Sequence, residues 1–93
     1  MLVMVLERAT ASLRGELSRW LTEIRPGVFL GGPSQRVRDE LWAKAVKKIR
    51  DGAVMQFWTA RTEQGFRCRQ HGTPSHSLED FDGLTMVSRY KKL

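Results

Sequence analysis

Residues 1–6, Met-Leu-Val-Met-Val-Leu, form an unbroken apolar run that Glu7 ends. A strand with one wet face alternates apolar and polar residues, whereas a continuous apolar run of this length is typical of a central strand covered on both faces. The run is much shorter than the roughly 20 apolar residues of a membrane helix, and no basic stretch precedes it as in a secretory signal. We therefore expect the centre of a sheet, no membrane segment and a cytoplasmic location.

Two stretches carry apolar residues at the spacing of a helix. In the first, a helix capped by Thr10 or Ser12 and stopped by Pro26-Gly27 would place on one face Leu13, Leu17, Trp20, Leu21 and Ile24. In the second, a helix capped by Ser34 and stopped by Gly52 would place on one face Val37, Leu41, Trp42, Ala45, Val46 and Ile49. The sequence therefore predicts two amphipathic helices.

Further strands are expected at residues 28–30, 53–60, 66–71 and 84–90, with a hairpin loop at 62–65. Strands and helices in this order predict a single α+β domain over residues 1–93, a ferredoxin-like two-layer sandwich with both helices on one face of an antiparallel sheet. The other face would keep apolar side chains, and a chain of 93 residues has a marginal core. A homodimer formed through this face would cover it.

The chain is basic, with 16 Lys and Arg against 10 Asp and Glu, a formal net charge of +6. The arginines fall into three groups, namely Arg8, Arg14 and Arg19; Arg36 and Arg38; and Arg67 and Arg69, which share a strand face near His71 and His76. The planar guanidinium suits phosphate groups, so these side chains are candidate contacts to a polyanion. The alternatives are ordinary surface charge and, for the strand arginines, protection of a sheet edge.

Other chemistry-bearing residues give weaker signals. Glu7 is the candidate catalytic and metal ligand: two copies across a dimer axis would bind Mg²⁺, although Glu7 alone fits an ion pair with Arg8 or Arg14. Cys68 is the one cysteine of the chain, which excludes a disulfide framework. With His71 and His76 it would make an open, three-ligand zinc site, and the alternative is that Cys68 faces the core.

The three tryptophans, Trp20, Trp42 and Trp58, are expected in the core. Trp58 directly follows Phe57, however, so one of these two aromatic side chains must point away from the helices. That side chain suits either a dimer interface or a platform for base stacking.

Several motifs, in order along nearly the whole chain, resemble CRISPR-associated protein 2 of the type I-E subfamily. They are MLVMVLER at the start, LRGELSRWL at 13–21, RPGVFLGG at 25–32, SQRVRDELW at 34–42, TEQGF at 62–66 and DFDGLTMVS at 80–88. The resemblance implies a ferredoxin-like fold and a symmetric homodimer, in which strand 84–90 joins the sheet of the partner subunit.

The resemblance also implies a role in CRISPR adaptation, the acquisition of new spacers for antiviral defence. Members of the subfamily bridge dimers of the integrase, CRISPR-associated protein 1, and hold the backbone of a duplex DNA. Arg14 matches a DNA-backbone ligand of the family, and Glu79, Asp80 and Asp82, with Leu84 and Met86 in the strand after them, match the segment that docks the integrase.

Two departures qualify this role. Ser75 and His76 stand where related members have an arginine pair, so that DNA contact would move to Arg67 and Arg69. Glu7 stands where many other members have the aspartate of a Mg²⁺-dependent endonuclease acting on RNA or DNA, which makes that activity the alternative function. A third alternative is an RNA-binding module, but residues 64–68 keep little of the aromatic RNA-binding motif.

Overall fold

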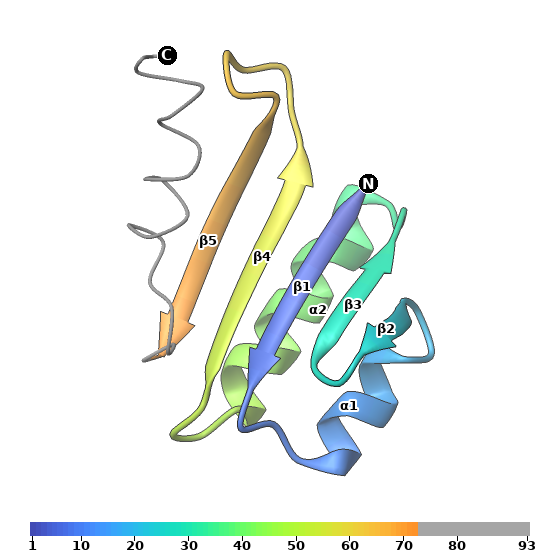
Figure 1. Ribbon diagram of the computed structural model, residues 1–93, viewed down its shortest axis with the longest axis vertical. Coiled ribbons are helices and arrows are strands. Elements are labelled where there is room, and N and C mark those ends of the chain that lie inside the picture. Colours follow the sequence, from blue (N-terminus) through green and yellow to red (C-terminus); the bar gives the residue numbers. More distant parts are fainter. Residues whose placement is uncertain (73–93) are drawn as a thin grey trace.

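The computed structural model describes residues 1–72, which form a five-stranded antiparallel sheet with two helices on one face (Figure 1). The elements are β1 (Leu2–Glu7), α1 (Ala11–Leu17), β2 (Thr22–Arg25), β3 (Val28–Gly31), α2 (Gln35–Lys48), β4 (Ala53–Thr59) and β5 (Phe66–Gly72). The strand order is β2-β3-β1-β4-β5. The predicted α+β ferredoxin-like sandwich is confirmed, while the strand expected at 84–90 lies outside the described residues.

The apolar opening forms β1 at the centre of the sheet, as expected. Its burial alternates: Leu2, Met4 and Leu6 are buried, whereas the residues between them are partly exposed. The buried side chains pack with residues of both helices and with Phe29, which is fully buried. The helices therefore cover only one face of β1.

The opposite face of the sheet, here called the open face, carries the other side chains of each strand. Val3 of β1 lies between Leu30 of β3 and Phe57 of β4 in the strand register. Val5 lies in the same way between Val28 and Met55. Neighbouring side chains on one face of a sheet form a continuous surface, so the open face is apolar across its three middle strands.

The first helix is much shorter than predicted, because α1 ends at Leu17 and the chain returns as β2. Pro26-Gly27 does not stop a helix but forms the turn between β2 and β3, with Gly27 at φ +82°. A side chain at Gly27 would collide with the carbonyl oxygen of Leu6. Pairing with β3 thus replaced the helical alternative for residues 22–25.

This change also removes two residues from the expected core. Trp20 is 58% exposed and Ile24 is 53% exposed. Trp20 lies in the turn after α1, and Ile24 lies at an irregularity in the pairing of β2 with β3. The prediction that Trp20 belongs to the core is therefore wrong.

The second helix agrees with its prediction at the start and ends slightly earlier than expected. The Ser34 hydroxyl accepts a hydrogen bond from the backbone N–H of Val37 at 3.2 Å. The helix ends at Lys48, and Arg50 takes the left-handed conformation at φ +59° before Gly52 is reached. Gly52 instead packs against the backbone of Glu7, where a side chain would not fit. Among the described residues, no helix has the length and apolar character needed to cross a membrane.

Candidate nucleic-acid interface

Two arginines and two tryptophans interleave where α2 packs on β4 and β5, and this group is here called the Arg–Trp cluster: Arg38 and Trp42 of α2, Trp58 of β4 and Arg69 of β5. The Arg69 guanidinium lies 4.7 Å from the ring centroid of Trp42 and 5.1 Å from that of Trp58. The Arg38 guanidinium lies 4.2 Å from the ring centroid of Trp58. Such cation–π contacts fix the position of both partners.

Gln56 of β4 connects the Arg–Trp cluster to the sheet. It lies opposite Arg69 in the strand register and its side chain is fully buried. Its amide nitrogen donates to the backbone carbonyl of Arg38 at 3.0 Å, and its amide oxygen accepts from Nε of Arg69 at 2.8 Å. A buried amide must be paired in this way, so Gln56 ties α2 to the outer strand.

Asp39 completes the cluster at its outer side. Its carboxylate accepts hydrogen bonds from Arg69 at 2.8 Å and from Arg38 at 3.2 Å. The hydrogen bond from Arg69, together with the smaller effect of Arg38, holds the pKa of Asp39 below its ordinary value. Both cluster arginines are thus committed to partners within the chain, although the sequence proposed both as DNA ligands.

The other predicted arginine ligands differ in how free they are. The Arg14 guanidinium contacts the Glu23 carboxylate at 2.8 Å, and the Arg36 guanidinium contacts the Glu40 carboxylate at 3.2 Å. Arg8 donates to the backbone carbonyl of Asp51. The Arg36–Glu40 pair is exposed and the Arg14–Glu23 pair is partly exposed. Ion pairs near solvent are weak, so a phosphate can displace the carboxylate partner.

Glu23 also stabilises the turn that follows it. Its carboxylate accepts a 2.8 Å hydrogen bond from the backbone N–H of Gly27. This N–H, and after it the Arg14 guanidinium, holds the pKa of Glu23 below its ordinary value. Glu23 therefore stays ionised and neutralises part of the charge of Arg14.

Within residues 1–72, a further set of arginine side chains makes no ion pair, hydrogen bond or ring contact: Arg19, Arg25, Arg50, Arg61 and Arg67. Arg19 and Arg67 are among the predicted ligands. Arg25, Arg50 and Arg61 were missed, because their freedom depends on which carboxylates lie near them in the fold. These side chains offer the largest unneutralised charge in the described part of the chain.

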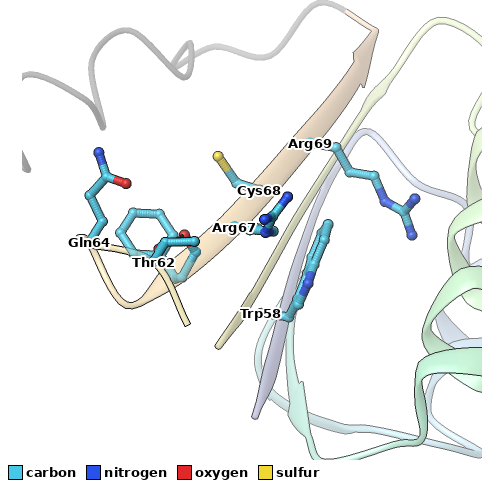
Figure 2. Close-up of a pocket in the computed structure, with 7 residues that line it drawn as sticks. Trp58, Thr62, Gln64, Arg67, Cys68 and Arg69 are labelled. Carbon is cyan, nitrogen blue, oxygen red and sulfur yellow. Dashed lines mark hydrogen bonds between the residues drawn. The ribbon is translucent and has the colours of Figure 1, made fainter. Parts of the chain in front are cut away.

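Figure 2 shows how Arg67 and Arg69 differ, although both project from the same face of β5. Arg69 reaches toward the helix, and Arg67 lies beside Trp58 near the hairpin. Cys68, between them in sequence, points to the opposite side. Cys68 lies opposite Phe57 on the open face, whereas His71 lies opposite Val54, which is in the core. Cys68 and His71 therefore lie on different faces of the sheet and do not form a zinc pair.

Glu7 lies on the open face at the end of β1, opposite Ala53. No group of three or more His, Cys, Asp or Glu side chains able to hold a metal occurs within residues 1–72. One carboxylate does not satisfy Mg²⁺, so a single chain does not fit that ion in its described part. The predicted residues Ser75, His76, Glu79, Asp80, Asp82, Leu84 and Met86 lie outside the described residues.

Strand order, helix placement and the excess of arginine define a basic protein of the ferredoxin-like α+β class. A family model described as CRISPR-associated protein (Cas_Cas2CT1978) matches residues 1–86, and the chain belongs to that family. The match covers every strand and both helices of the described residues 1–72. It confirms the resemblance to CRISPR-associated protein 2 at the level of the family.

Proposed function

We propose that the protein is a type I-E adaptation subunit, a homodimer that holds the backbone of a duplex DNA and bridges integrase dimers while new spacers are inserted. Membership of the CRISPR-associated family supports this role. The observation that carries the DNA-binding part is the set of arginines without partners in residues 1–72, on a chain of net charge +6. Binding to phosphates needs charge and register but no base reading, which these side chains supply.

The open face supports the homodimer. Val3, Val5, Leu30 and Phe57 are half-buried in the single chain, so a second copy placed on them would remove apolar surface from water. A symmetric pair would place the same patch on both subunits. It would also double the number of arginines presented to one duplex.

The integrase-docking part of the proposal rests on the family resemblance of Glu79, Asp80, Asp82, Leu84 and Met86. Co-purification of the protein with the integrase tests this part directly. Substituting the three acidic residues by Asn or Gln should remove the integrase while leaving the homodimer. Retention of the integrase would contradict the assignment of this segment.

Arg14 offers a direct test of binding to the DNA backbone, because its carboxylate partner, Glu23, can be substituted separately. Arg14→Ala should weaken binding to a blunt duplex and lower the slope of log K against log salt by about 0.9 for each phosphate that the arginine neutralised. Glu23→Gln keeps an oxygen for the Gly27 N–H but releases Arg14, so it should strengthen binding by up to about fivefold. Fluorescence anisotropy over a salt series measures both quantities.

Asp51→Asn is the matched control for Glu23→Gln, since it changes the net charge equally, and the structure shows no ion pair of Asp51 with another described residue. It should strengthen binding less than Glu23→Gln does. Equal effects of the two variants would mean that only the net charge matters. An unchanged salt slope in Arg14→Ala would likewise remove Arg14 from the interface.

The alternative function is a Mg²⁺-dependent endonuclease that uses Glu7 from both subunits. Packing through the open face would bring the two copies of Glu7 into one interface. Cleavage of RNA or duplex DNA should then need added Mg²⁺, stop with EDTA and disappear in Glu7→Ala. Glu7→Gln should abolish it as well, with the fold retained. Cleavage that survives either substitution would exclude Glu7 as the metal ligand.

A further inference from the structure

A pocket of about 520 Å³ lies at the hairpin end of β5, and its size is within the usual range for small-ligand sites. Figure 2 shows its lining, which is made by Trp58, Thr62, Gln64, Phe66, Arg67, Cys68 and Arg69. The lining comes from both faces of β5: Trp58, Arg67 and Arg69 lie on the helix face, and Phe66 and Cys68 lie on the open face. Holding a duplex by its phosphates uses none of this aromatic surface.

Trp58 is the fixed wall of this pocket. The Arg38 guanidinium and the Arg69 guanidinium both lie over its ring. In Figure 2 the indole is seen edge-on, with Arg69 on its helix side and Arg67 on the side of the pocket. The Arg–Trp cluster therefore orients the indole before any ligand arrives, which lowers the entropy cost of stacking on it.

Arg67 is the polar group beside Trp58 that is available to a ligand, while Gln64 lies at the far end of the pocket. Arg67 lies opposite Trp58 in the strand register and is exposed. Neither Arg67 nor Gln64 makes a side-chain hydrogen bond or ion pair to another residue within 1–72. Thr62, by contrast, uses its hydroxyl within the hairpin, donating to the Phe66 carbonyl and accepting from the Gly65 N–H.

We propose that this pocket binds one unpaired nucleotide of a DNA strand. The base stacks on Trp58, and the adjoining phosphate lies on Arg67. The site requires a base that is free of its partner, so it would act on a single-stranded end and not on the paired middle of a duplex. It goes beyond the proposed function, and its chemistry does not depend on that function.

The test compares three DNA ligands: a blunt duplex, the same duplex with a short 3′ thymidine overhang that contains one 2-aminopurine, and a thymidine single strand. The overhang should raise the affinity about tenfold over the blunt duplex. The 2-aminopurine fluorescence should fall on binding, because the base stacks on an indole. Trp58→Leu should bring the affinity ratio to about one and restore the fluorescence, whereas Trp58→Phe should keep part of both.

Trp20→Leu is the matched control, since it removes an exposed tryptophan that lies outside the pocket. It should leave the affinity ratio unchanged, and melting curves confirm that each variant is folded. A ratio of one in the unsubstituted protein, or a ratio that survives Trp58→Leu, overturns the inference while blunt-duplex binding keeps the proposed function intact. If the protein does not bind the blunt duplex but binds the single strand in a Trp58-dependent way, the inference stands and the proposed duplex binding is wrong.

Discussion

Val3→Glu should convert the proposed homodimer to a folded monomer. Val3 is on the central strand, between Leu30 and Phe57 on the open face, and in a dimer formed through that face two new carboxylates would be buried without partners. Each unpaired buried charge costs several kcal/mol, so the dissociation constant should rise at least about 100-fold. Sedimentation velocity over a concentration series measures this change.

The same substitution should also weaken duplex binding, because a monomer presents half as many arginines. The salt slope should fall to about half its value in the unsubstituted protein. Val3→Thr is the control, since it has the same shape and no charge and should keep most of the dimer. An unsubstituted protein that is monomeric at all concentrations, or a Val3→Glu protein that still dimerises, would rule out the open face as the interface.

Arg69→Leu should lower the free energy of unfolding by about 2–4 kcal/mol, even though Arg69 belongs to a surface strand. The substitution leaves the buried oxygen of Gln56 without its donor, a loss of about 1–3 kcal/mol, and removes two cation–π contacts. In a domain of this size the melting temperature should fall by about 10–30 °C. Urea unfolding gives the free energy directly.

A double-mutant cycle separates the buried amide from the rest of the cluster. Gln56→Leu alone should cost less than Arg69→Leu, because Arg69 keeps Asp39 and remains partly in contact with water. The double variant should be more stable than the sum of the two single effects predicts, by at least about 1 kcal/mol, since the buried Gln56 amide oxygen is then no longer present to be left without its donor. Additive effects would show that Gln56 and Arg69 do not depend on each other.

The sequence predicted most of the fold, because most of its elements follow one clear pattern. The apolar run placed β1 at the centre, Ser34 marked the start of α2, and Gly65 fits the β4–β5 hairpin with φ +85°. The failure at residues 18–25 has a simple cause. Leu17, Leu21 and Ile24 suit a helix face, and only pairing with β3, a tertiary contact, selects the strand.

The candidate interface was less predictable, because the availability of an arginine depends on its neighbours in space. Arg67 and Arg69 look equivalent in the sequence, yet Arg69 is held by Gln56 and Asp39, which lie 13 and 30 positions away. Arg14 likewise meets Glu23 only because β2 folds back beside α1. Periodicity correctly placed both strand arginines on one face but did not show which of them is available.

Glu23 serves two purposes that oppose each other. The same carboxylate secures the reversal of the chain at Gly27 and screens Arg14 from a ligand. A substitution that exposes the charge of Arg14 therefore tends to destabilise the turn at Gly27. A substitution that stabilises this turn tends to neutralise Arg14. The stability of the turn and the affinity for an anion cannot both be improved at position 23 unless the residue that replaces Glu23 still accepts a hydrogen bond.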